Sequence, residues 1–226
     1  MSNEDKAWSK KHYNIEDIGE YDLKPTPFID KHSEFLLEKN IKKVLDAGCG
    51  QGRNSLYLAN QGFNVISVDS SENALKLCAE LLEKKGHVSK TIHNRLQNLE
   101  NVETKSIDAI ISTTVLTHIA NNDIGSVIGE FYRVLNKKGY LIADFANHKD
   151  STYEYISKGK KIEDNVFLEN GTIVAYRNKD EVENLFNKDK WEIILLKDES
   201  FIEPPHPGSR SFEHEHNSYV VLAQKK

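Results

Sequence analysis

The chain has 226 residues, of which 29% are charged and 38% hydrophobic, as is typical of a folded soluble domain rather than a disordered or membrane-embedded one. Its net charge is −5 and it has no long basic block, so a nucleic-acid partner is not expected. No segment approaches the roughly 18 apolar residues that span a bilayer, and the acidic beginning argues against secretion. Cys49 and Cys78 form no Cys-x-x-Cys pair, which favours a reducing, cytoplasmic location.

Residues 1–40 are expected to form a segment that covers the rest of the domain. Pro25 and Pro27 discourage a helix there, because proline lacks the N–H group that a helix interior requires. Aromatic side chains of this segment could close over a ligand or simply anchor the segment to the domain. They are Trp8, Tyr21 and Phe28.

From residue 41 onward, short β-branched runs alternate with segments of helical period, which predicts βαβ units and a parallel sheet. We expect strands at residues 41–46, 65–69, 88–93, 107–112 and 140–145. One helix should end at Gly62, and the next should be capped by Ser70 or Ser71. A later helix buries a face formed by Ile124, Val127, Ile128, Phe131 and Leu135 and ends at residues 137–139.

The C-terminal part of the chain is less regular. Residues 147–177 show no clear periodicity and are expected to be an insertion over one end of the sheet, where they could cover a substrate. Asn178 and Glu181 resemble a capping box that begins a helix. Final strands are expected at residues 191–196 and 219–223, joined by a proline-rich hairpin connection. The predicted fold is α/β, with a Rossmann-like, doubly wound sheet of about seven strands, mostly parallel with an antiparallel C-terminal strand, and helices on both faces.

Residues 46–52, Asp-Ala-Gly-Cys-Gly-Gln-Gly, place an acid and three glycines between the first strand and the next helix. Glycine is needed where the backbone turns with positive φ or approaches a ligand, and the first N–H groups of a helix can bind an anionic group. A tight turn without a ligand is the alternative. A dinucleotide fingerprint requires Gly at position 53, where the chain has Arg53, so NAD is disfavoured. Asp69 ends the second strand, where an acid can accept hydrogen bonds from both hydroxyls of a ribose.

These features resemble the class I S-adenosylmethionine-dependent methyltransferases, whose first motif is Asp/Glu-x-Gly-x-Gly-x-Gly. Asp46, Gly48, Gly50 and Gly52 match this motif completely. The resemblance extends over about residues 41–145 of the chain. It implies a Rossmann-like fold and methyl transfer from S-adenosylmethionine.

Three further segments are similar to one branch of this family. Residues 50–59, Gly-Gln-Gly-Arg-Asn-Ser-Leu-Tyr-Leu-Ala, look like the tellurite-resistance methyltransferases and their small-molecule relatives. Residues 111–116, Ile-Ser-Thr-Thr-Val-Leu, support the same branch. Residues 133–139, Arg-Val-Leu-Asn-Lys-Lys-Gly, are similar to the family's Arg-Val-Leu-Lys-Pro-Gly-Gly turn, with the Pro and one Gly lost.

The resemblance implies S-adenosylmethionine as the methyl donor and S-adenosylhomocysteine as the product. Asp46 would help to hold the methionine ammonium, the glycine loop would pack against the methionine portion, and Asp69 would bind the ribose. Ser112 would offer its backbone carbonyl to the ammonium. The expected cofactor-binding residues are Asp46, Gly48, Cys49, Gly50, Gly52, Arg53, Asp69, Ser70, Leu96, Gln97 and Ser112.

Two family patterns are absent. The third strand usually ends in an acid that binds the adenine amino group, whereas Arg95 stands at this place. Either Leu96 and Gln97 supply the adenine contacts through backbone and side chain, or the strand has a different register. The Pro-Pro-Tyr or Pro-Pro-Phe signature of enzymes that methylate amino groups of nucleic-acid bases is missing after the fourth strand, which argues against that class.

Methyl transfer from a sulfonium is an in-line displacement, so the protein acts chiefly by positioning, and a general base helps only if the nucleophile must lose a proton. The candidate catalytic residues are His118, His206 and Arg210, with packing at a helix start as the alternative for His118. His206 and Arg210 cluster with His214 and His216 in the last hairpin, where the latter two would share one strand face and a solvated loop is the alternative. No cysteine or regular ligand spacing accompanies these histidines, so no metal is expected.

The sequence therefore predicts a methyltransferase for a small-molecule acceptor with an oxygen, sulfur, nitrogen or chalcogen oxyanion nucleophile, bound under residues 147–177. Two alternatives stay open, a cofactor-binding regulatory domain without turnover and a protein or RNA methyltransferase. Neither a nucleic acid nor a membrane is expected as a partner, and the chain should be a monomer or a homodimer. One domain is expected over residues 1–226, with a cover segment (1–40), a cofactor-binding core (41–146), a substrate-cover insertion (147–177) and a C-terminal helix and β-hairpin (178–226).

Overall fold

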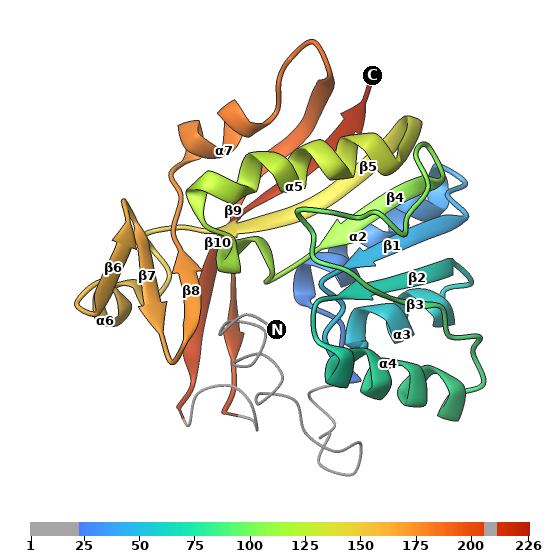
Figure 1. Ribbon diagram of the computed structural model, residues 1–226, viewed down its shortest axis with the longest axis horizontal. Coiled ribbons are helices and arrows are strands. Elements are labelled where there is room, and N and C mark those ends of the chain that lie inside the picture. The colour runs from blue at the N-terminus through green and yellow to red at the C-terminus, as the bar shows by residue number, and fades with distance from the viewer. Residues whose placement is uncertain (1–22, 206–211) are drawn as a thin grey trace.

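The computed structural model describes residues 23–205 and 212–226 of the chain. Its main sheet has seven strands in the order β3-β2-β1-β4-β5-β10-β9 (Figure 1). These strands are β1 (Lys43–Ala47), β2 (Asn64–Asp69), β3 (Thr91–His93), β4 (Ile107–Ser112), β5 (Leu135–Ala146), β9 (Trp191–Glu203) and β10 (His214–Lys225). The pairs among β1 to β5 are parallel, whereas β10 is antiparallel to both of its neighbours. The predicted Rossmann-like sheet, mostly parallel with an antiparallel C-terminal strand, is confirmed.

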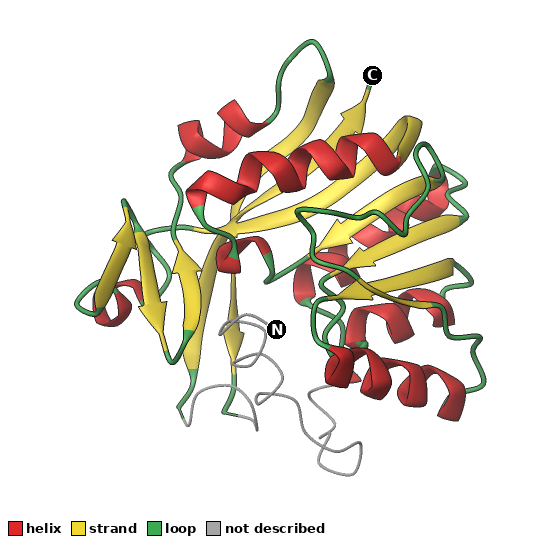
Figure 2. Ribbon diagram, in the orientation of Figure 1, coloured by secondary structure: helices red, strands yellow, loops and turns green. Residues whose placement is uncertain are grey.

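Helices cover both faces of this sheet, as predicted (Figure 2). Val44 and Leu45 point to opposite faces, because successive side chains of a strand alternate. Val44 packs with apolar residues of α2 and α3, and Leu45 lies in a larger core with α5 and α7. The helices are α2 (Pro27–Glu38), α3 (Arg53–Asn60), α4 (Glu72–Lys84), α5 (Asn121–Val134), α6 (Tyr153–Ile156) and α7 (Lys179–Leu185), with the short 3-10 helix η3 (Leu116–His118). Among the described residues, no helix has the length and apolar character needed to cross a bilayer.

The helix α2 contradicts the prediction that Pro25 and Pro27 keep the N-terminal segment from being helical. Pro27 is the first residue of the helix, where the N–H group that proline lacks would have no intrahelical partner, and Pro25 lies outside the helix. Phe28, in the first turn, is buried and anchors the helix to the domain. The other two aromatic residues predicted to close or anchor this segment, Trp8 and Tyr21, lie outside the described residues.

The junction of α5 and β5 also differs from the prediction. The helix ends at Val134, and Leu135, predicted to be helical, already pairs with β4. The register then shifts before Tyr140 pairs with β4 again, and Lys138 adopts a positive φ of 65° between these two points. The cations and glycine of residues 137–139 therefore mark an irregularity within the strand rather than the end of the helix.

Three strands near the sheet edges differ in length from the prediction. β3 begins at Thr91, and Val88, predicted to belong to it, is 93% exposed, because only three residues of β2 pair with this strand. β9 and β10 extend well beyond residues 191–196 and 219–223 as one long antiparallel ribbon. Charged side chains on the exposed side of the ribbon interrupt the apolar pattern on which the prediction relied.

Residues 147–177 contain regular structure that their sequence pattern did not predict. β6 (Lys160–Glu163), β7 (Val166–Glu169) and β8 (Thr172–Ala175) form a separate three-stranded antiparallel sheet, at the left of Figure 1. Asn170 and Gly171, both with positive φ, join β7 to β8, and an Asn-Gly pair is a typical hairpin signal. The strands have four residues each, too few to show a clear period. The capping box of Asn178 and Glu181, which follows, is confirmed.

Arg177, which follows β8, links this small sheet to the loop after β4. It is buried and donates hydrogen bonds to the carbonyl oxygens of Leu116 at 3.0 Å and Ile119 at 2.6 Å. Burial lowers its pKa to about 10, since the charged form loses hydration. A second link is the hydroxyl of Thr117, which donates to the carbonyl oxygen of Ala175 at 3.1 Å. These bonds fix the position of η3 against β8.

We expect Arg177→Met to lower the free energy of unfolding by about 2–4 kcal/mol, because it leaves buried carbonyl oxygens without their donor. Urea denaturation followed by circular dichroism measures this change. Lys179→Met removes an exposed cation two residues further on and should change the free energy by less than about 0.5 kcal/mol. Equal destabilisation by the two substitutions would contradict the structural role of Arg177.

Candidate active site

The glycine loop between β1 and α3 is shaped by steric limits at two of its three glycines. Gly48, Gly50 and Gly52 have φ values of 83°, 52° and 94°, which side chains of L-residues disfavour. A Cβ atom on Gly48 would lie 2.5 Å from Val115 Cγ2, and one on Gly52 would lie 2.7 Å from Cys78 Sγ. A Cβ atom on Gly50 would meet nothing within 4 Å. The loop therefore packs tightly on both sides and leaves open space at its middle.

The carboxylate of Asp69, at the end of β2, holds this loop in place. Its Oδ2 accepts the N–H of Gly50 at 2.9 Å, and its Oδ1 accepts the N–H of Ser71 at 2.9 Å. Each carboxylate oxygen can accept more than one hydrogen bond, so both keep capacity for a ligand. A direct hydrogen bond therefore joins the second acid to the glycine loop, at the crevice where open α/β sheets bind their ligands.

The other predicted acid, Asp46, lies at the buried base of the loop and is 2% exposed. Its Oδ2 accepts the hydroxyl of Ser55 at 2.6 Å, and Ser55 in turn lies 2.8 Å from the hydroxyl of Ser67. Burial raises the pKa of Asp46 to about 7, against the opposing effect of the Ser55 hydrogen bond. Near neutral pH this carboxyl is therefore divided between its neutral and its charged form, and a nearby cation would favour the charged form.

The loop after β4 is held by a second buried acid, Asp144, which the sequence patterns did not point out. Ser112 closes β4 and donates its hydroxyl to the carbonyl oxygen of Ala47 at 3.0 Å. Thr114 has a φ of 58°, and its N–H donates to Asp144 Oδ1 at 2.6 Å. Burial raises the pKa of Asp144. Its place at the carboxyl end of β5, next to a loop with positive φ, is a position where functional residues gather.

A buried network of three polar side chains, also not predicted, joins the beginnings of α2 and α3 to this loop. Asn54 Oδ1 accepts the N–H of Thr26 at 2.8 Å, and Asn54 Nδ2 donates to Thr113 Oγ1 at 2.9 Å. The hydroxyls of Thr113 and Thr26 lie 3.2 Å apart. No sequence motif marks these residues, because they meet only through the fold. They fix the beginning of α2 beside the loop after β4.

The residues after β3 lie beside Asp69. Asn94, rather than Arg95, directly follows the strand, and its N–H donates to the carbonyl oxygen of Asp69 at 3.2 Å. Arg95 is exposed, and Gln97 is half-buried. The side chain of Leu96 is buried in the core, so only its backbone could contact a ligand.

Of the three candidate catalytic residues, the structure describes His118 alone. His118 ends η3, and its Nδ1 lies 2.6 Å from the carbonyl oxygen of Ile173 on β8, which favours a packing role. His206 and Arg210 lie outside the described residues.

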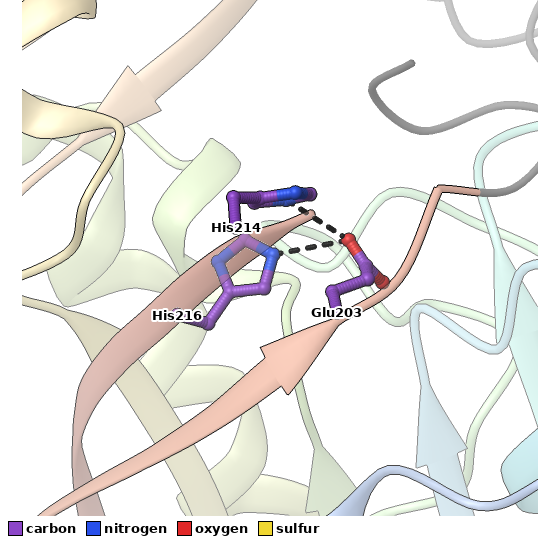
Figure 3. Close-up of side chains that lie close together, drawn as sticks. All are labelled: Glu203, His214 and His216. Carbon is purple, nitrogen blue, oxygen red and sulfur yellow. Dashed lines mark hydrogen bonds and ion pairs between the residues drawn. The ribbon is translucent and has the colours of Figure 1, made fainter. Parts of the chain in front are cut away.

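His214 and His216 lie on β10 and share one face, as predicted, and both point toward Glu203 on β9 (Figure 3). The alternative of a solvated loop is wrong for these two histidines, because both belong to a strand and His214 is buried. Burial lowers the pKa of His216, but hydrogen bonds to Asp150 and Glu203 outweigh it and raise the pKa to about 9. Glu203 and Asp150 were not predicted, because pairing across the hairpin brings them to the histidines.

Comparisons with known proteins show what this region is similar to. Residues 45–143 match the family model of a methyltransferase domain. The chain is 37% identical over 99 residues to the probable S-adenosyl-L-methionine-dependent methyltransferase TehB of Haemophilus influenzae, with 43% of this chain and 34% of that protein covered. It is 30% identical over 156 residues to the glycine/sarcosine N-methyltransferase of Halorhodospira halochloris, with 65% of this chain and 58% of that protein covered. The chain thus spans less than two thirds of the length of these relatives.

Solved structures show the same fold. A SAM-dependent methyltransferase from Methanosarcina mazei superposes with a TM-score of 0.72 at 21% identity. The match covers 89% of this chain and 98% of that one. TehB from Haemophilus influenzae superposes with a TM-score of 0.64 at 24% identity. This match covers 87% of the present chain and 62% of the TehB chain. The matched residues 45–143 include the glycine loop, Asp69 and the end of β4. Residues 45–143 are therefore similar to the methyltransferase domain of the family model and to TehB, within a fold that solved SAM-dependent methyltransferases share.

Proposed function

We propose that the chain transfers a methyl group from S-adenosylmethionine to a small-molecule acceptor. The observation that carries this proposal is the carboxylate of Asp69, fixed by the N–H groups of Gly50 and Ser71 beside open space at the glycine loop. Each oxygen of the carboxylate can accept one ribose hydroxyl in addition to its backbone N–H. The adenosine would then lie over the carboxyl ends of β1 and β2.

The methionine portion of the cofactor would lie along the glycine loop. Its ammonium would approach the carbonyl of Ser112 and the carboxylate of Asp46. Because the pKa of Asp46 is about 7, a cationic ligand can shift this carboxyl to its charged form. The first N–H groups of α3 would attract its carboxylate. The proposed cofactor contacts comprise Asp46, Gly48, Cys49, Gly50, Gly52, Arg53, Asp69, Ser70, Leu96 through its backbone, Gln97 and Ser112.

The acceptor would bind at the carboxyl ends of β4 and β5, beside Thr114 and Asp144. Residues 147–177, which Arg177 holds against the loop after β4, would cover it. Similarity to TehB and to a protein named for glycine and sarcosine supports an acceptor of small size. Catalytic roles for His118, His206 and Arg210, a cytoplasmic location, and a monomeric or homodimeric state stay predictions.

We expect Asp69→Asn to weaken binding of S-adenosylhomocysteine by about 10–100-fold, because the charge that strengthens two ribose hydrogen bonds is lost. Isothermal titration calorimetry measures the dissociation constant. Asp108→Asn is the matched control: this acid lies at the opposite end of the sheet, where it accepts the N–H of Lys43 at 2.9 Å, and its replacement should leave the affinity unchanged. A dissociation constant within about twofold of the native value for Asp69→Asn would sink the assignment of the ribose site.

Asp46→Asn should raise the free energy of unfolding but weaken binding of the cofactor product. The pKa of Asp46 rises from 3.8 to about 7 on folding, so the folded state binds more protons between these values and the stability contributed by this carboxyl falls as the pH rises through them. The ligand-free variant should therefore exceed the native protein in free energy of unfolding by about 1–3 kcal/mol at about pH 8, and by less at about pH 5. Urea denaturation at both pH values measures this.

The same substitution should weaken binding of S-adenosylhomocysteine, since the neutral amide attracts the ammonium less than a carboxylate does. A variant that is less stable than the native protein at about pH 8 would refute the buried position of an ionised carboxylate at this site. Unchanged affinity would refute its contact with the ammonium.

Turnover is tested with a panel of small acceptors that contains thiols, amines, phenols and selenium or tellurium oxyanions. We expect formation of S-adenosylhomocysteine and methylated acceptor, detected by mass spectrometry, for at least one class, and its reduction in Asp69→Asn. Tight cofactor binding without turnover of any acceptor would instead favour a regulatory domain.

A further inference from the structure

Three side chains meet near the tip of the ribbon formed by β9 and β10. Glu203, the last residue of β9, lies opposite His214, the first residue of β10, and His216 follows on the same face (Figure 3). Glu203 Oε2 lies 3.2 Å from His214 Nε2 and 3.1 Å from His216 Nε2. The two imidazole rings have their centroids 4.6 Å apart. One carboxylate oxygen and two imidazole nitrogens thus converge on one point.

These separations agree with those of ligands on one metal ion. Two atoms bound at about 2.0–2.2 Å from an ion lie about 3.0–3.5 Å apart in octahedral or tetrahedral coordination. The two separations from Glu203 Oε2, 3.2 and 3.1 Å, fall within this range. The candidate ligand atoms of Glu203, His214 and His216 all lie within 4.8 Å of one another. A small rotation of the side chains would therefore admit an ion.

The far nitrogens of both histidines have acceptors that orient the rings. His216 Nδ1 lies 3.0 Å from Asp150 Oδ2, and His214 Nδ1 lies 3.2 Å from the carbonyl oxygen of Phe212. Metal-binding histidines nearly always donate the second ring N–H to a carboxylate or a backbone carbonyl in this way. When an ion binds, His216 Nε2 would give up the proton that it shares with Glu203, and the lone pairs of both Nε2 atoms would point at the ion.

Asp150 is itself held in a fixed position. It is 4% exposed, and Oδ1 accepts the N–H of Thr152 at 2.9 Å and its hydroxyl at 2.5 Å. Its Oδ2 accepts the N–H of Asn217 at 3.2 Å as well as contacting His216. A group that orients a metal-binding histidine needs such support of its own.

We propose that Glu203, His214 and His216 bind a divalent transition-metal ion, with Zn²⁺ as the first candidate, and that Asp150 orients His216 toward it. Two imidazole nitrogens and a carboxylate oxygen are a typical set for zinc and for other divalent transition metals. Three protein ligands leave a tetrahedral position open. The sequence analysis expected no metal because it used only the spacing of residues along the chain. The pairing of β9 with β10, which brings Glu203 to the histidines, does not appear in that spacing.

The proposed metal site lies on the strand next to the proposed acceptor region. Ser218, two residues after His216, pairs with Ala146 at the end of β5. His216 acts electrostatically on Asp144, whose carboxylate accepts the N–H of Thr114 in the loop after β4. An oxygen of the acceptor would occupy the open position, an assignment that rests on the proposed methyltransferase function. Binding of the ion itself does not depend on that function.

The direct test is calorimetric titration of the full chain, freed of metal by a chelator, with Zn²⁺. We expect one ion per chain with a dissociation constant below about 1 µM. Co²⁺ in its place should give the visible absorption bands of an ion with four nitrogen and oxygen ligands. Absence of saturable binding for both ions overturns the proposal and leaves the cluster as ion pairs only.

Three substitutions locate the ion. Glu203→Gln and His216→Gln should each weaken Zn²⁺ binding by more than about 10-fold, and Asp150→Asn by about 10-fold. Glu215→Gln, between the two histidines on the exposed face of β10, is the matched control and should keep the native affinity. Binding of S-adenosylhomocysteine at the native affinity shows that each variant is folded. Native Zn²⁺ affinity in Glu203→Gln, His216→Gln and Asp150→Asn overturns the proposed site.

The role of the open position is measured separately, once an acceptor is known. Loading the chain with Zn²⁺ should lower KM for an acceptor that carries an anionic or hydroxyl oxygen and leave the affinity for S-adenosylhomocysteine unchanged. Bound Zn²⁺ without any effect on KM overturns the role in acceptor binding. Because the titrations need no turnover, failure of the metal site and failure of the methyltransferase proposal give different results.

Discussion

The arrangement of this domain depends on the carboxylate of Asp69, which joins the glycine loop after β1 to the beginning of α4 after β2. Its two oxygens accept the N–H groups of Gly50 and Ser71, so one side chain fixes two neighbouring loops at the carboxyl end of the sheet. Backbone N–H groups that would otherwise lack partners are satisfied, and the open space at Gly50 is kept. A negative charge thus stands where a ribose would present its hydroxyls.

Buried acids recur around this end of the sheet, with different tasks. Asp46 supports the loop from below, and Asp144 holds the turn at Thr114. Burial raises the pKa of both carboxyls, so each costs stability when charged and favours a cationic or hydrogen-bonding partner. Asp150 differs, since hydrogen bonds to His216 and Thr152 outweigh burial and lower its pKa. The two carboxyls whose charged form burial disfavours, Asp46 and Asp144, therefore lie where ligands are proposed to bind.

The ribbon of β9 and β10 carries the second group of side chains for which we propose a function. Pairing continues to Glu203 and His214, near the tip of the ribbon. The pairing register brings an acid and two histidines together although they are separated in sequence, and the residues around Asp150 support them from the segment after β5. Chemistry at this place would complement the positioning that the methyltransferase core supplies.

Sequence patterns predicted the parts of the fold that follow a simple period. The buried strands β1, β2 and β4, the amphipathic helix α5 and the glycine loop were found because each obeys a local rule. The helix α2 was missed because Pro27 occupies its first position, and the small sheet because its strands have four residues each. Glu203, Asp144 and Asp150 could not be found, since contacts across the fold, rather than neighbours in sequence, give them their place.

A crystal structure of the chain with S-adenosylhomocysteine tests the central claim most directly. We predict both ribose hydroxyls within hydrogen-bond distance of the Asp69 carboxylate, the amino acid portion along Gly48, Gly50 and Gly52, and the sulfur directed toward the ends of β4 and β5. An adenosine bound elsewhere, or an Asp69 carboxylate that contacts only the backbone N–H groups of Gly50 and Ser71, would contradict the account.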